Sequence, residues 1–121
     1  MKFCWATLNV KNMEESLKFY KETIGLRVNR RLEAGNGIEI AFLGDGETKL
    51  ELIFDINKSE TNVGDDISIG FEIESVEEKI KFLKEKEIDI ESGPFQPNPS
   101  IKFFYIKDPN GLKVQLVENI H

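Results

Sequence analysis

Residues 5–26 read WATLNVKNMEESLKFYKETIGL, and residues 68–89 read SIGFEIESVEEKIKFLKEKEID. Aligned at a constant offset of 63 residues, the two stretches repeat the same charged and aromatic positions: Glu14 with Glu77, Glu15 with Glu78, Lys18 with Lys81, Phe19 with Phe82, and Glu22 with Glu85. Downstream, IAFLGD at 40–45 corresponds to FFYIKD at 103–108. A repeat of this length predicts two equivalent supersecondary units, so a shared ligand site should use paired positions from both halves.

Length and composition predict one soluble domain. The chain has 121 residues, of which 40% are hydrophobic and 31% are charged, an ordinary balance for a globular protein. No apolar run approaches the roughly 18 residues of a membrane span, and no signal peptide precedes the first strand, so we expect a cytoplasmic location. The net charge of −6 argues against nucleic acid and anionic membranes as partners, because both require clustered Lys and Arg.

Each half is predicted to have the element order βαβββ. In the first half, strand patterns cover Lys2–Val10, Leu26–Glu33, Ile38–Leu43 and Leu50–Ile56, and a helix begins after Asn12. In the second half, strand patterns cover residues 67–73, Asp89–Glu91, Ile101–Ile106 and Leu112–Glu118, and a helix begins after Ser75. Asn12 with Glu15, and Ser75 with Glu78, have the spacing of N-terminal caps.

The connections divide the chain into a first module at 1–57, a linker at 58–65 and a second module at 66–121. The polar stretch 57–65 has the composition of a linker or mobile loop. A second segment, 92–100, holds three of the four prolines and is predicted to be irregular. Two interpretations of it stay open, a cover over a ligand cleft or a stiff connector that replaces a weak strand.

Strand parity identifies a candidate site. On the first strand, Cys4, Ala6, Leu8 and Val10 form an apolar face that should meet the helix, which leaves Trp5 and Thr7 on the opposite face. The same argument applied to the repeat and to the last strand of each half selects four positions on the uncovered faces: Trp5, Glu51, Ser68 and Gln115. A sheet face that mixes large apolar and polar side chains suits a small-molecule ligand.

Two motifs add a family resemblance that covers nearly the whole chain. NMEESLKFY at 12–20 followed by IGLRV at 24–28 resembles the opening signature of the glyoxalase, bleomycin-resistance and extradiol-dioxygenase superfamily, which has the vicinal oxygen chelate fold. DPNG at 108–111, before the final strand, resembles its closing motif. The resemblance implies an α+β protein in which two tandem βαβββ modules have curved mixed sheets that form a cup, with the helices on the outside.

The resemblance also implies where a metal would bind. Metal enzymes of the superfamily usually place two His and two Glu at the four repeat-related positions, where they hold a divalent cation that polarises the substrate. Of the four residues here, Glu51 is a strong ligand and Gln115 offers a carbonyl oxygen, whereas Trp5 cannot coordinate and Ser68 is a poor ligand. We therefore expect no metal and no other cofactor.

Other catalytic classes lack the residues they need. His121, the only histidine, lies at the end of the chain, so a two-His iron site and dioxygenase chemistry are not expected. Cys4 is predicted to be an inert residue of the helix-facing side. Glu51 should contact a ligand, accept a proton, or pair with a basic neighbour, for which Lys49, Lys113 and Arg27 are the candidates.

Three functional hypotheses follow. The first is a metal-independent protein that binds a small aromatic or cationic molecule through Trp5, Glu51, Ser68 and Gln115, similar to the drug-sequestering resistance proteins of the superfamily. The second is a glyoxalase I-like lyase or isomerase in which Glu51 is the catalytic base or a metal ligand. The third is a structural or regulatory homodimer without a small ligand. Open sheet edges make a homodimer the expected assembly in all three cases.

Overall fold

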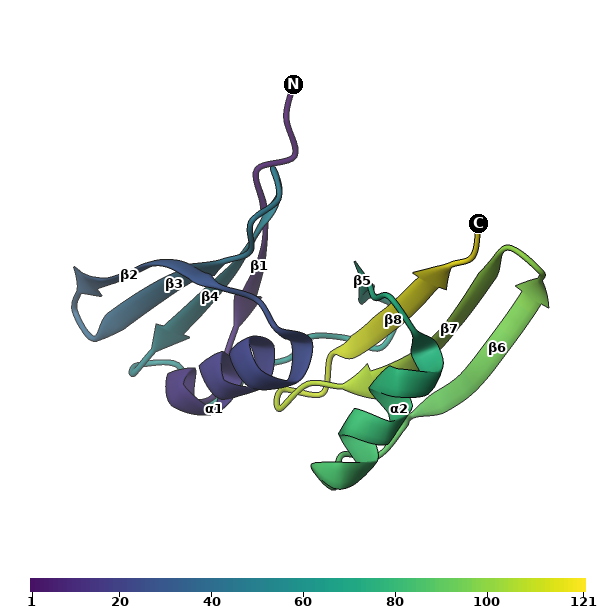
Figure 1. Ribbon diagram of the computed structural model, residues 1–121. Coiled ribbons are helices and arrows are strands. Elements are labelled where there is room, and N and C mark those ends of the chain that lie inside the picture. Colours follow the sequence, from purple (N-terminus) through teal and green to yellow (C-terminus); the bar gives the residue numbers. More distant parts are fainter. The chain divides into compact units, whose positions relative to one another are not determined.

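The computed structural model describes residues 1–121, which divide into two compact units, Met1–Val63 and Gly64–His121 (Figure 1). The change from one unit to the other falls in the polar stretch between the two repeats. Whether modules 1–57 and 66–121 act as a single functional domain stays a prediction.

The first unit contains one helix and a four-stranded mixed sheet. Its elements are β1 (Trp5–Asn9), α1 (Met13–Lys18), a π-helical turn η1 (Phe19–Ile24), β2 (Val28–Gly35), β3 (Ile38–Leu43) and β4 (Lys49–Asp55). The strand order is β1-β4-β3-β2, in which β1 and β4 are parallel and the other pairs are antiparallel.

The second unit repeats this arrangement. Its elements are β5 (Ser68–Glu72), α2 (Val76–Glu85), β6 (Ser92–Asn98), β7 (Ile101–Lys107) and β8 (Lys113–Asn119). The strand order is β5-β8-β7-β6, again with one parallel pair, between β5 and β8. The predicted α+β class and the paired βαβββ order are confirmed.

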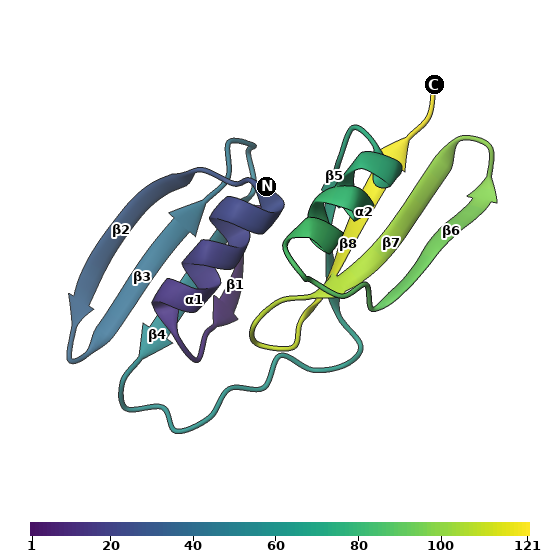
Figure 2. The same cartoon turned by 60° about the horizontal axis from the view of Figure 1, so that its bottom comes forward.

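Each helix covers one face of its own sheet, as Figure 2 shows for α1 and α2. The buried apolar side chains of the strands lie on that face, because alternate residues of a strand point to opposite sides. In the first unit these residues are Leu8, Ala41, Leu43, Leu50 and Leu52; in the second they are Phe104, Ile106, Val114 and Leu116. The opposite face of each sheet has no helix of its own unit over it.

Both helices begin at the predicted caps. The Asn12 side chain accepts a hydrogen bond from the Glu15 backbone N–H at 3.0 Å, and the Ser75 hydroxyl accepts one from the Glu78 N–H at 3.1 Å. Each cap satisfies an N–H group that has no partner within the helix. The two repeats therefore start their helices by the same device.

The first helix ends in a π-helical turn that the apolar spacing did not predict. The backbone N–H groups of Gly25 and Leu26 both donate to the carbonyl of Tyr20, at 3.1 and 2.8 Å. Gly25 has φ of 93°, a left-handed conformation in which glycine is the favoured residue. Tyr20, which lies in this turn, is fully buried.

Segment 92–100 is a correction to the sequence analysis. We expected a strand at Asp89–Glu91 followed by irregular chain, but the strand is β6, and it pairs with β7 through Ser92, Phe95 and Asn98. Pro94 and Pro97 lack an N–H, which argues against a central strand, yet an edge strand needs hydrogen bonds on one side only. The register shifts between these pairs accommodate the prolines.

The position of Cys4 is a second correction. The first strand begins at Trp5, and Cys4 is exposed rather than buried under the helix. Residues 2–4 run beside the β3–β4 connection instead, where the Lys49 N–H donates to the Cys4 carbonyl at 2.9 Å and the Thr48 hydroxyl donates to the Phe3 carbonyl at 2.8 Å. This extension leaves the Phe3 side chain exposed.

Neither helix is long and apolar enough to cross a membrane.

Replacement of Asn12 by Ala should lower the free energy of unfolding by about 1 kcal/mol, because the Glu15 N–H loses its acceptor. Asn12→Asp keeps an acceptor and is the matched control, expected to stay within about 0.5 kcal/mol of the wild-type protein. Urea denaturation followed by circular dichroism measures both values. Equal stabilities for the Ala and Asp variants would contradict the capping role.

Candidate functional site

The uncovered face of the first unit carries two of the four predicted site residues. Trp5 lies opposite Lys49, and Glu51 lies between Thr7 on β1 and Phe42 on β3. The parallel register and the period-two alternation place all five side chains on the same side of the sheet. Trp5 and Glu51 are thus on the same face, one register position apart.

Glu51 is the buried acidic group of this face. Its side chain is only 8% exposed, and the Thr7 hydroxyl donates a hydrogen bond to its Oε1 at 2.5 Å. A charge-assisted hydrogen bond of this kind offsets part of the cost of removing a carboxylate from water. The carboxylate is held in a fixed position by a neutral donor.

Of the three alternatives for Glu51, the pairing with a basic neighbour is wrong for two of its three candidates. Arg27 pairs with Asp45 at 2.8 Å, and the Lys49 ammonium donates to the Gly46 carbonyl. Lys113 lies in the second unit, where its ammonium is 5.7 Å from the ring centroid of Tyr105. Sequence proximity suggested cations, whereas the strand register brings Thr7 to the carboxylate.

Trp5 presents an aromatic surface at the edge of the same face. Its side chain is 51% exposed, and its ring meets Phe42 edge to face, with centroids 5.5 Å apart and an interplanar angle of 64°. This geometry is favourable for aromatic pairs and leaves ring surface available for stacking. Trp5 is therefore supported by packing but is not part of the buried core.

The uncovered face of the second unit carries the other two residues. Ser68 is exposed and lies opposite Lys113, while Gln115 lies between Gly70 on β5 and Tyr105 on β7. The Gln115 amide nitrogen donates to the Tyr105 hydroxyl at 3.4 Å. A Cβ at Gly70 would lie 3.1 Å from Gln115 Oε1, so the glycine makes room for the amide.

Glu51 and Gln115 receive their hydrogen-bond partners from different neighbouring strands. In the first unit the hydroxyl comes from Thr7 on the parallel neighbour, and the antiparallel neighbour supplies Phe42. In the second unit the parallel neighbour supplies Gly70, and the hydroxyl comes from Tyr105 on the antiparallel neighbour. The hydroxyl partner thus comes from the parallel neighbour in the first unit and from the antiparallel neighbour in the second.

The face of the second unit also has an aromatic cluster that the four-position argument missed. Phe95, Phe103 and Tyr105 contact each other, with ring centroids 5.6 to 6.5 Å apart. The alternation of β7, which places Phe103 and Tyr105 on the side of Gln115, was a signal available in the sequence. The contribution of Phe95 was not predictable, because β6 itself was missed.

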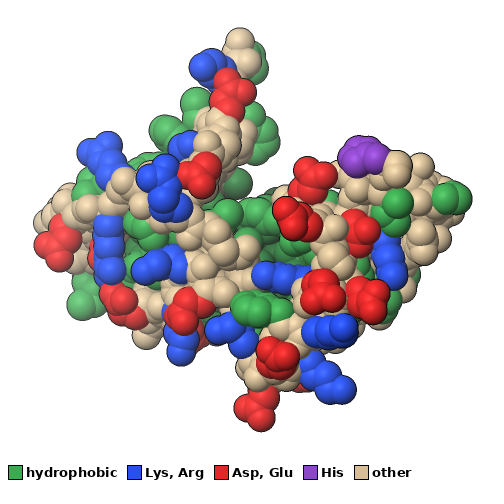
Figure 3. All heavy atoms as spheres, in the orientation of Figure 1, with side chains coloured by type: hydrophobic (Ala, Val, Ile, Leu, Met, Phe, Trp, Pro, Cys, Tyr) green, Lys and Arg blue, Asp and Glu red, His purple; other side chains and the backbone are tan.

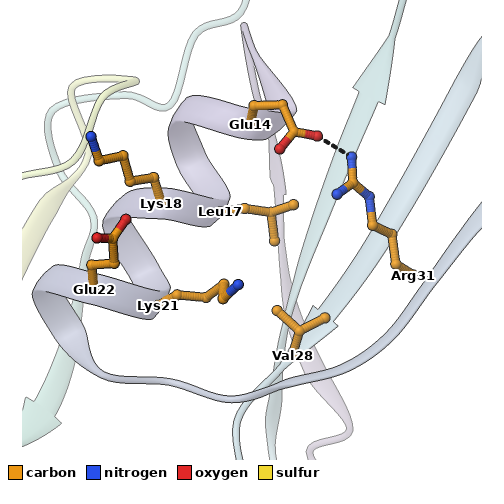
Figure 4. A pocket seen from close by; sticks show the side chains of 7 residues that line it. All are labelled: Glu14, Leu17, Lys18, Lys21, Glu22, Val28 and Arg31. Carbon is orange, nitrogen blue, oxygen red and sulfur yellow. Dashed lines mark hydrogen bonds and ion pairs between the residues drawn. The ribbon is translucent and has the colours of Figure 1, made fainter.

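A groove on the helix side of the first unit is not part of this site. It has a volume of about 500 Å³ and a wall formed by Leu17 and Val28, and Figure 4 shows Glu14 and Arg31 turned toward each other beside it. Hydrogen bonds to Glu39 and then to Glu14 raise the pKa of Arg31 above its ordinary value. The guanidinium joins the helix to β2 and β3.

The charges on the surface are intermixed. Figure 3 shows both acidic and basic side chains on the face in view.

Residues 2–116 match the family model described as Glyoxalase/Bleomycin resistance protein/Dioxygenase superfamily. The chain belongs to this superfamily. Among curated relatives, it is 27% identical to a lactoylglutathione lyase of Neisseria meningitidis, in an alignment that covers 98% of this chain and 91% of the relative.

Solved structures of the superfamily share the fold. Glyoxalase I of Leishmania major superposes with a TM-score of 0.84 at 21% identity, over 98% of this chain and 86% of that one. TnmS3, an antibiotic binding protein from Streptomyces sp. CB03234, superposes with a TM-score of 0.78 at 17% identity, over 98% and 96% of the two chains. The same fold therefore occurs in an enzyme and in a binding protein.

The four positions do not fit the divalent metal that the family implies. Trp5 has no donor atom for a metal, and Ser68 offers only a neutral hydroxyl. Glu51 already accepts a hydrogen bond from Thr7, and the Gln115 amide nitrogen is bonded to Tyr105. Of these four positions, each unit offers at most one such oxygen donor, the Glu51 carboxylate in the first and the Gln115 amide oxygen in the second, fewer than the roughly four ligands of a stable protein site.

Replacement of Thr7 by Val should lower the free energy of unfolding by about 1–3 kcal/mol, because the buried Glu51 carboxylate loses its hydroxyl donor. Thr7→Ser retains the hydroxyl and is the control, expected to lose less than about 1 kcal/mol. Urea denaturation at pH 7 compares the variants. If the Val and Ser proteins were equally stable, the hydrogen bond to Glu51 would not contribute to the fold.

Proposed function

We propose that this superfamily member is a metal-independent protein that binds a small aromatic molecule, of the kind sequestered by resistance proteins. The observation that carries the proposal is the half-exposed Trp5 ring, supported by Phe42 and lying near the buried Glu51 on a face that no helix of its unit covers. A planar ligand that stacks on Trp5 gains contact with little ordering cost, because the ring is already packed.

The other predicted residues support the same proposal. Ser68 and Gln115 provide neutral hydrogen-bonding groups on the second unit, beside the cluster of Phe95, Phe103 and Tyr105. A mixture of aromatic surface and few polar groups is typical of small-molecule sites. Glu51 favours a ligand that is neutral or cationic over an anionic one.

A glyoxalase I-like lyase is the second candidate. The names of the curated relatives favour it, and Glu51 is a fixed carboxylate that is suited to accept a proton from a substrate. The loss of two ligand positions counts against it. A structural or regulatory homodimer without a ligand is favoured less, because Trp5 is not packed into a closed core.

We also propose that the protein forms a homodimer in the cytoplasm and that its partners include neither nucleic acid nor membranes. The exposed Phe3, Ile56 and Ile67 side chains support an apolar contact between copies, because such side chains gain from burial. The single cysteine and the net charge of −6 support the location and the excluded partners.

Divalent metals should not stabilise the protein. Thermal unfolding of metal-stripped protein, titrated separately with Ni²⁺, Zn²⁺, Mn²⁺ and Mg²⁺, is expected to show a change in Tm below about 1 °C, whereas a site saturated at 100 times its Kd would add about 2.7 kcal/mol. Glu51→Gln is the matched variant. A rise of several degrees that this variant abolishes would establish a metal site and favour the lyase.

Aromatic ligands should quench Trp5, which is the only tryptophan and therefore a specific reporter. The probes are a set of biphenyl and naphthalene carboxamides together with the cation acridinium. For a probe that quenches, calorimetric titration of Trp5→Ala should show about 2-fold to 30-fold weaker binding, since stacking contributes about 0.5–2 kcal/mol. Trp5→Phe should retain part of the affinity. Equal affinities of the wild-type and Ala proteins would contradict the role of Trp5.

A further inference from the structure

A small pocket lies where the linker returns to the ends of the two parallel strands of the first unit. It has a volume of about 270 Å³, and Asn9, Ile53 and Phe54 form one side of it. Residues 58–61, which follow β4, form the other side. The linker therefore does more than join the two repeats, because it encloses space against the sheet.

This pocket lies at the next register position along the face that carries Trp5 and Glu51. Asn9 lies opposite Ile53, and the preceding register position on this face is the Thr7–Glu51 pair. Residues two apart on a strand are neighbours on the same face, about 7 Å apart. A ligand that contacts Glu51 is thus next to the mouth of the pocket.

The pocket contains a polar group that has no partner. The Thr61 hydroxyl oxygen is buried and makes no hydrogen bond within the chain. Buried hydroxyl groups almost always have a partner, and a threonine hydroxyl can both donate and accept. A polar group of a ligand in the pocket would supply this missing partner when the Thr61 side chain turns toward it.

The charges around the pocket balance. Lys11 and Lys58 contribute two cations, and Asp55 and Glu60 contribute two anions. A charged ligand group would therefore meet a like charge as well as an opposite one. An uncharged polar group, such as a carboxamide or a hydroxyl, meets no such penalty.

We propose that the linker pocket binds the polar end of an elongated, uncharged ligand whose aromatic part lies on Trp5. Trp5 and Asn9 are four residues apart on one strand, which corresponds to about 13 Å. The ligand class is thus a rod-shaped aromatic compound with a terminal hydrogen-bonding group, and Thr61 determines the preference for that group. This inference rests on the proposed binding function.

The test uses the full chain and a matched pair of probes, biphenyl-4-carboxamide and 4-methylbiphenyl, which differ only in the terminal polar group. Quenching of Trp5 gives the Kd of each probe. The carboxamide should bind the wild-type protein about 5-fold to 10-fold more tightly than the methyl compound. Thr61→Val, which replaces the hydroxyl by a methyl group, should remove that difference, and Thr61→Ser should preserve it.

The outcomes separate this inference from the function on which it rests. Quenching by both probes with equal affinity, unchanged by Thr61→Val, would overturn the inference and leave the binding function in place. Equal weakening of the carboxamide by the Val and Ser variants would also overturn it, because the effect would then come from packing. If neither probe quenched Trp5, the proposed function would fail for this ligand class and the inference with it.

Discussion

Each four-stranded sheet buries only one face against its own helix, and the rest of the structure depends on this constraint. The apolar residues on the helix side, such as Leu52 in the first unit and Leu116 in the second, are fully buried. Because side chains alternate along a strand, the residues between them must point the other way. The facing of Glu51 and Gln115, away from the helix, is therefore a consequence of core packing.

The same alternation explains how much was predictable from sequence. It placed Thr7 and Glu51 on one face and Leu8 and Leu52 on the other, and the strand register sets the members of each pair opposite each other. It was wrong at Cys4, since the strand begins one residue later and the preceding residues pair with the β3–β4 connection. The alternation of residues predicts which side of the sheet each side chain faces. It does not predict the residue at which the hydrogen bonding of the strand begins.

The largest error, at β6, has a different cause. Pro94 and Pro97 are evidence against a strand when each residue is judged by its own preference. An edge strand tolerates both, because β7 is its only neighbour and the register shifts remove the need for an N–H at each position. Tertiary position overrode local preference, and it also brought Phe95 to Phe103 and Tyr105, a contact that no local pattern indicated.

The two repeats use different strands to supply the hydroxyl that bonds the polar side chain at the centre of each sheet face. Glu51 is served by Thr7 and Gln115 by Tyr105, whereas the equivalents of these donors in the other repeat, Gly70 and Phe42, have no hydroxyl. Glu51 and Gln115 thus each have one hydroxyl partner within their own unit. The Thr7 hydroxyl donates to Glu51 Oε1, and the Gln115 amide nitrogen donates to the Tyr105 hydroxyl, with Gly70 beside the amide oxygen. These internal hydrogen bonds hold both polar side chains in place, while Trp5 in the first unit and Phe95 in the second leave aromatic surface exposed.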